Sequence, residues 1–106
     1  MKWILKILNI QQYKITCLWN DNQVRTIDLT HFIDEKSRNP ESSYGKLKDQ
    51  SLFLNAKCDG STIYWENQII MTDYDHVEKL GPLDIDPDFL YGLSYSDQDI
   101  RMVSEP

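Results

Sequence analysis

Apolar residues recur along the first third of the chain in short runs that suit β-strands. Residues 3–10 form an apolar run with one lysine, which is long enough for a strand and too short for a capped helix. Residues 13–19 and 24–29 are rich in β-branched and aromatic residues, and the Asn-Asp-Asn run at 20–22 tolerates a left-handed turn. The pattern therefore predicts a first strand followed by a hairpin.

A second hairpin is predicted around Asp59-Gly60, a two-residue sequence that is typical of tight hairpin turns. Residues 51–58 would supply its first strand and residues 62–65 its second, with alternate side chains facing the core. Residues 69–71 suit a further short strand or an apolar plug. Residues 73–82 end in Gly-Pro and have the composition of a connection.

Short helices are predicted at three places along the chain. Thr30 stands at an N-cap position ahead of one or two helical turns, and residues 44–47 suit one more turn. Asp86 followed by Pro87 is typical of a helix start. The sequence therefore predicts an α+β fold in which two hairpins form an antiparallel sheet of about five strands, with short helices packed on one face.

The chain length of 106 residues suits one domain and is too short for two. Apolar residues make up 41% and charged residues 26%, as in a globular domain. We expect residues 1–95 to form the domain and residues 96–106 to be a tail that frays or docks as an added strand. The predicted core and structural residues are Trp19, Ile27, Leu29, Phe53, Ile63, Trp65, Asp86, Phe89 and Leu90.

Acidic residues are concentrated in the second half of the chain. Residues 1–50 carry 8 basic and 6 acidic side chains, whereas residues 51–106 carry 3 and 11, and the net charge is −6. Because a phosphate backbone repels such a surface, we expect no direct nucleic-acid binding and favour a small basic protein as partner. Solubility alone is the other explanation of the charge. The predicted partner-binding residues are Asp73, Asp75, His76, Glu78 and Asp84.

The sequence contains no recognisable catalytic motif, and we predict that the protein is not an enzyme. Cys17 and Cys58 lack the paired spacing of a zinc site, and we expect free thiols in a reducing cytoplasm, with a disulfide as the alternative. His31 and His76 are the only histidines, and nothing in the pattern supplies either with a nucleophile. No apolar run approaches the roughly 18 residues that cross a bilayer, so we expect no membrane contact.

Aspartates at 84, 86 and 88 have the spacing of the first ligands of a calcium loop. Such a loop also needs a glycine at its sixth position and a glutamate at its twelfth, where this chain has Phe89 and Tyr95. Helix capping is therefore the favoured role of these acids, and we predict no metal and no cofactor.

Several short motifs occur in a recognisable order. They are the strand 13–19, Ile27-Asp28-Leu29 with Phe32-Ile33, Leu47-Lys48-Asp49 before Phe53, Thr62-Ile63-Tyr64-Trp65, and Asp84 to Tyr91. This order resembles the small bacterial domain-of-unknown-function family numbered 2442, over about residues 10–93. The chain departs from the family pattern at 20–22, which lacks the usual glycine, and at 68–82, which is longer than usual.

The resemblance implies a compact α+β domain without established activity, sometimes fused to a helix-turn-helix region. It also implies a gene beside that of another small protein, as in toxin and antitoxin pairs. We therefore expect an interaction module, the neutralising or regulatory member of a two-protein system. The alternative is a small ligand-binding or metal-binding domain or enzyme that uses the acidic second half, and a homo-oligomer is compatible with either.

Overall fold

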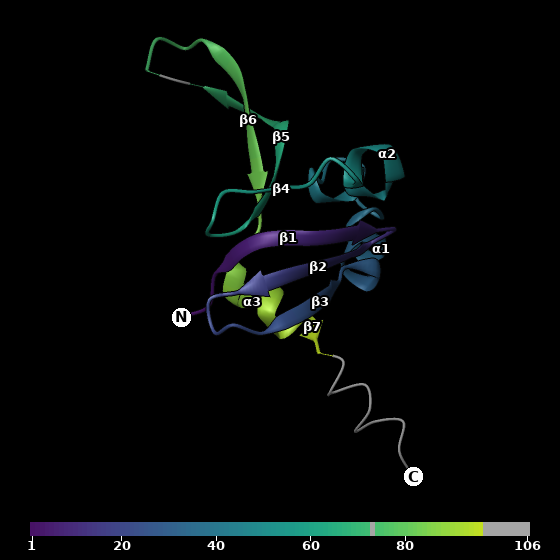
Figure 1. Cartoon of the computed structure of the whole chain (residues 1–106). Coiled ribbons are helices and arrows are strands. Elements are labelled where there is room, and N and C mark those ends of the chain that lie inside the picture. The colour runs from purple at the N-terminus through teal and green to yellow at the C-terminus, as the bar shows by residue number, and fades with distance from the viewer. Residues whose placement is uncertain (73, 97–106) are drawn as a thin grey trace.

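The computed structural model describes residues 1–72 and 74–96, which form a body of two small sheets and short helices with one projecting β-ribbon (Figure 1). The first sheet has the order β1-β2-β3-β7 and contains β1 (Ile4–Gln11), β2 (Lys14–Trp19), β3 (Val24–Asp28) and β7 (Ser94–Tyr95). The second has the order β4-β5-β6 and contains β4 (Lys57–Cys58), β5 (Ile63–Thr72) and β6 (Glu78–Asp84). Every strand pairing is antiparallel.

The helices are short and join the strands. They are α1 (Thr30–Lys36), the 3-10 helix η1 (Tyr44–Lys48), α2 (Gln50–Phe53) and α3 (Pro87–Gly92). No helix within the described ranges is long and apolar enough to cross a membrane. The α+β class, the antiparallel pairing and the short helices agree with the prediction.

The prediction of one five-stranded sheet is wrong, because the structure has two sheets. The predicted strand 51–58 is the cause: its first part is the helix α2, and only Lys57–Cys58 remains as β4. Asp49 caps this helix, since its carboxylate accepts the backbone N–H of Ser51 at 2.9 Å. The turn signal at Asp59-Gly60 still marks a hairpin, in which Cys58 pairs with Ile63.

Residues 74–82 are also more regular than the connection predicted at 73–82. Residues 78–84 form β6, which pairs with nearly the whole of β5, so the predicted short strand at 69–71 belongs to a ten-residue strand. The Gly-Pro pair at 81–82 lies inside β6 instead of ending a connection. Proline is tolerated there because β6 is an edge strand.

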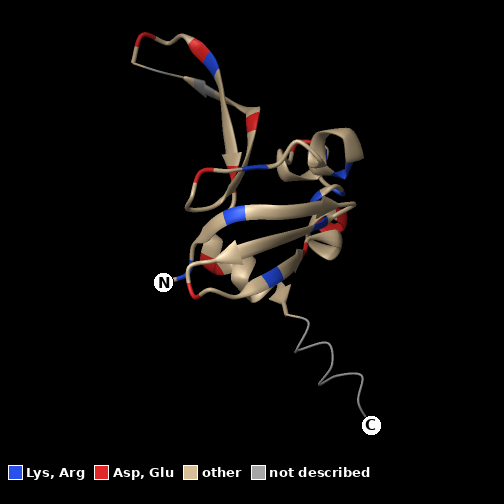
Figure 2. Cartoon of the chain, in the orientation of Figure 1, with Lys and Arg blue, Asp and Glu red and all other residues tan. Residues whose placement is uncertain are grey.

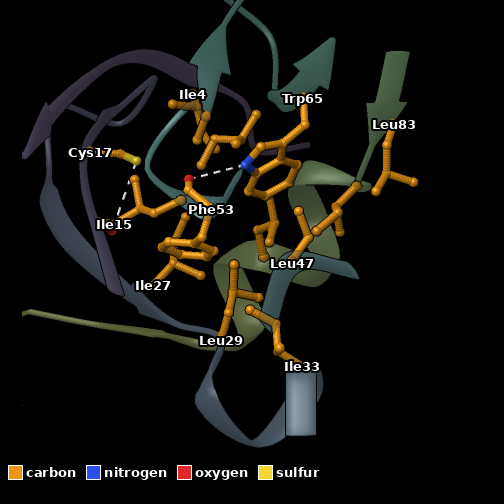
Figure 3. Close-up of a cluster of buried hydrophobic side chains, with 14 of the residues drawn as sticks. Ile4, Ile15, Cys17, Ile27, Leu29, Ile33, Leu47, Phe53, Trp65 and Leu83 are labelled. Carbon is orange, nitrogen blue, oxygen red and sulfur yellow. Dashed lines mark hydrogen bonds between the residues drawn. The ribbon is translucent and has the colours of Figure 1, made fainter. Parts of the chain in front are cut away.

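The core lies between the inner face of the first sheet, the helices and the lower part of the second sheet (Figure 3). Trp65 joins two of these layers, because its indole Nε1–H donates to the carbonyl oxygen of Phe53 at 3.1 Å. Thr62, three residues earlier in the chain, is also buried and donates its hydroxyl to the carbonyl oxygen of Ile85. The buried members among the predicted core residues are Trp19, Ile27, Leu29, Phe53, Ile63, Trp65 and Leu90.

Among the apolar residues of the predicted core, Phe89 is the exception, since 44% of it is exposed. On α3 the next residue, Leu90, faces the core and is fully buried. Phe89 instead lies at the surface against Phe32 of α1, with 5.4 Å between the ring centroids. One helical position of about 100° therefore separates the buried residue from the exposed one.

The helix caps agree with the sequence at α3 and differ at α1. The Asp86 carboxylate accepts the backbone N–H of Asp88 at 3.2 Å, as an N-cap does. Thr30, in contrast, is the first helical residue of α1 and does not cap it. The Asp28 carboxylate accepts the Thr30 N–H at 3.0 Å instead.

Both cysteines are free thiols, as predicted. Cys17 is fully buried on β2, and burial raises its pKa from 9.0 to about 12. Cys58 is half-buried, and burial raises its pKa as well. Both side chains therefore act as small apolar groups near neutral pH.

Candidate protein interface

The β5–β6 ribbon bends away from the body at a bulge in β5. Trp65 pairs with Leu83 and Ile69 with Gly81, so three β5 residues lie opposite Pro82 alone. In the bulge Asn67 has a φ of 59°, a left-handed conformation that asparagine tolerates better than most residues. Beyond the bulge, residues 69–72 and 74–81 form the arm, which stands clear of the body in Figure 1.

One face of the arm is exposed and apolar at its centre. Ile70 lies directly opposite Leu80, and the two side chains are 67% and 63% exposed. Thr72 and Glu78 form the next pair on this outward face. On the other face Ile69 packs against the core and Gly81 is buried. The outward face is therefore the side of the arm without support from the body.

A hollow of about 240 Å³ lies at the root of the arm, where the outward face meets the bulge. Its lining residues include Tyr64, Glu66, Leu80 and Pro82. Glu66 also pairs with Lys57 at 3.0 Å, and this hydrogen bond raises the pKa of Lys57. Because about half of each of these side chains is exposed, the pair contributes little and Glu66 can exchange its partner.

The structure places four of the predicted partner-binding residues on this one ribbon. Asp75 and His76 lie between β5 and β6 at the tip, and His76 has a φ of 59°. Glu78 begins β6 and Asp84 ends it, both on the side of β6 that carries Leu80. Asp73 lies outside the described residues, as do 97–106, most of the predicted tail.

Other acids of the second half have local structural roles. Asp59 accepts the backbone N–H groups of Ser61 and Thr62, both at 2.9 Å, and the bond from Thr62 holds its pKa below the usual value. Asp86 caps α3, and Asp88 accepts the backbone N–H of Lys2 at 2.8 Å. Figure 2 accordingly shows acidic positions on both the arm and the turns of the body.

The aspartates with calcium-loop spacing do not converge on one point. Asp86 and Asp88 turn to backbone N–H groups, and Asp84 lies on β6. Within residues 1–72 and 74–96, no three histidine, cysteine, aspartate or glutamate side chains are grouped to hold a metal ion.

The body has a separate cavity of about 450 Å³, within the usual size range of small-molecule sites. Its lining includes Tyr13, Asp28, His31, Asp34 and Lys48, which come from the first half of the chain. His31 is exposed and lies 3.9 Å from Glu35. None of the predicted partner-binding residues is among the cavity's lining residues.

Sequence reasoning missed the apolar part of the interface. The sequence pattern predicts Ile70 only in a short strand or plug, and Leu80 only in a connection. The signal for a strand here is that Glu78, Leu80 and Pro82 alternate with residues that face inward. The Gly-Pro pair at 81–82 conceals this signal, because that dipeptide is typical of a turn.

No family model matches the chain, and neither a curated protein nor a solved structure matches it. The resemblance to family 2442 thus stays a prediction.

Proposed function

We propose that the chain is a non-enzymatic interaction module whose β5–β6 arm docks a small basic protein. The observation that carries the proposal is the pair of opposed side chains, Ile70 and Leu80, each about two-thirds exposed on a ribbon of two strands. Exposed apolar side chains with a polar surround are typical of protein interaction sites.

The charges around this pair favour a basic partner. Glu78 lies on the tip side of Leu80 and Asp84 on the root side, along the same face of β6. The whole chain carries a net charge of −6, which steers a cationic protein toward it. In this arrangement the apolar pair supplies affinity, and the acids supply the association rate.

The hollow at the root suits an arginine or lysine of the partner. Tyr64 and Glu66 are among its lining residues, and their side chains are of the kinds that form a cation–π contact and an ion pair with such a cation. Since the exposed Glu66–Lys57 pair contributes little, a partner cation can replace Lys57 at small cost. The resemblance stated above adds the expectation that partner and module form an antitoxin-like or regulatory pair.

The test begins with the tagged protein in a lysate of its own cell at low and high salt, followed by identification and purification of what binds. Two pairs of variants are then compared in binding kinetics with that purified protein. Leu80→Lys places a charge on the outward face, and Val24→Lys does so at an exposed site on β3. Glu78→Lys reverses a charge on the arm, and Glu35→Lys reverses one on α1.

We expect Leu80→Lys to weaken binding about tenfold or more, because buried anchors account for most interface energy. Glu78→Lys should slow association and flatten its salt dependence. Val24→Lys and Glu35→Lys should bind as the wild type does. Equal behaviour within each pair of variants would contradict the proposal.

A further inference from the structure

The open edges of the two sheets differ in how well they resist pairing with another chain. In the part of the chain that the structure describes, β1 carries Lys6 and two bulges, and β6 carries Pro82 as well as Glu78 and Lys79. The strand β7 has only two residues. Charges, bulges, proline and short length are the features by which edge strands avoid new partners.

The outer edge of β5 on the arm is short, but between residues 69 and 72 it has no charge, no proline and no bulge. Within the described ranges, β4 pairs only with Ile63 and Tyr64, so the edge beyond the bulge has no strand beside it. Its residues 69–72, Ile-Ile-Met-Thr, contain no charge and no proline and favour β-structure. We call residues 69–72 the open edge.

We propose that the open edge pairs with the same edge of a second copy of this chain. The two β5 strands would run antiparallel about a two-fold axis near Ile70, and the arms would form one sheet of order β6-β5-β5-β6. This inference does not depend on the proposed function, because it uses the edge of the arm and not its outward face.

A second copy suits this edge because an uncharged segment can pair with itself without bringing like charges together. Pairing near the two-fold axis also places Ile70 beside the partner's Ile70. With Leu80 opposite Ile70 in each arm, four apolar side chains then form one continuous row on the outward face.

The energetics favour a reversible dimer. A ribbon of two strands is marginally stable by itself, and each arm gains a sheet of four strands. The contact covers only four residues on each β5, so it buries less than the roughly 1,200 Å² of a stable interface. Each copy carries −6, so association opposes charge repulsion and should strengthen as salt screens it.

Sedimentation velocity of the full chain over a range of concentrations, at low and high salt, tests the proposal. Ile70→Lys introduces a charge beside the axis, whereas Leu80→Lys introduces the same charge on β6, one strand further from it. We expect a wild-type dimer that strengthens with salt, its retention in Leu80→Lys and its loss in Ile70→Lys. An equimolar mixture of Ile70→Lys and Ile70→Glu should form the dimer again, because the opposite charges then meet beside the axis. If Ile70→Lys had lost the dimer by unfolding the arm, the mixture would stay monomeric.

Amide hydrogen exchange then locates the contact. In the dimer, alternate amides of residues 69–72 that face away from β6 should become protected, since they gain carbonyl partners.

A monomer at every concentration and salt, or a dimer without this protection, would overturn the proposal. So would a dimer that Leu80→Lys removes and Ile70→Lys spares. Docking of a basic protein should weaken as salt is added and should be weakened by Leu80→Lys, whereas the dimer should strengthen with salt and tolerate Leu80→Lys. One proposal can therefore be contradicted while the other holds.

Discussion

Single side chains connect the layers of this small core. Trp65 belongs to the second sheet, Phe53 ends α2, and the bond from the indole Nε1–H to the Phe53 carbonyl joins them across 3.1 Å. The two rings also lie in contact, with 5.9 Å between their centroids. The pair therefore fixes α2 against the sheet that carries the arm.

Trp65→Phe should lower the free energy of unfolding by about 0.5–1.5 kcal/mol beyond the effect of lost ring volume, which is the net contribution of one hydrogen bond. The Phe53 carbonyl would lose its indole donor and keep the backbone N–H of Ala56, which donates to it at 3.2 Å. Chemical denaturation measures the change. A loss no larger than that expected for the smaller ring would show that the hydrogen bond contributes nothing.

Cys17 makes the stability of the folded state fall as the pH becomes alkaline. Because burial raises the pKa of its thiol to about 12, the folded state keeps the proton while the unfolded thiol, with a pKa near 9.0, ionises. This contribution is complete below pH 9 and is lost as the pH rises toward 12. The stability difference between the wild type and Cys17→Ala should therefore shrink over that range. A difference that stays constant in denaturant melts from pH 8 to 11 would contradict this assignment.

At the scale of elements, the bulge in β5 decides where the arm points. Three residues opposite one bend the strand, and Asn67 takes the left-handed conformation that the bend requires. The local sequence Glu-Asn-Gln at 66–68 contains no proline or glycine from which this bend could be predicted. It follows from pairing with β6, where Trp65 and Ile69 each have a fixed partner.

Asn67→Gly should preserve the arm, and Asn67→Val should destabilise it by about 1–3 kcal/mol, because a β-branched residue is strained at positive φ. The change should appear as faster amide exchange in residues 69–72, while the exchange of β2 stays the same. Equal exchange in the two variants would mean that the bulge does not depend on the conformation of this residue.

At the scale of the whole molecule, the body and the arm have different sources of stability. Among the residues whose burial the structure describes, the buried core cluster lies outside the arm, and Ile69 of the arm packs against it. The arm is therefore an extension that the body supports, and its exposed residues can change without reorganising the core.

Replacing residues 67–81 by Asn-Gly should leave the body folded. The two-residue turn joins Glu66 to Pro82 and keeps the pairing of Trp65 with Leu83. We expect a loss of about 1–2 kcal/mol for the contact of Ile69, and loss of both partner binding and self-association. Circular dichroism melts measure the loss of stability, and sedimentation and binding kinetics measure the loss of self-association and of partner binding. A melting transition that disappears would show that the body depends on the arm.

Local features of the fold could be predicted from sequence because each depends on neighbouring residues. The turn at 20–22, the Asp86 cap and the short 3-10 turn at 44–47 depend on conformational preference and on hydrogen bonds within a few positions. Periodicity likewise indicated the burial of Ile27, Ile63 and Trp65. It failed at α2, where the apolar run at 52–54 suits a strand, whereas the Asp49 cap favours a helix.

The candidate interface was predictable only in its charge. The sequence by itself determined the acidic excess, the free cysteines, the turns and the α+β class, since these follow from composition and from interactions between near neighbours. Tertiary structure alone decided that the strands divide into two sheets, that Phe89 is exposed, and that Ile70 and Leu80 meet on an uncovered face. The physical reason is that pairing and burial depend on contacts between distant segments, whose geometry no local pattern contains.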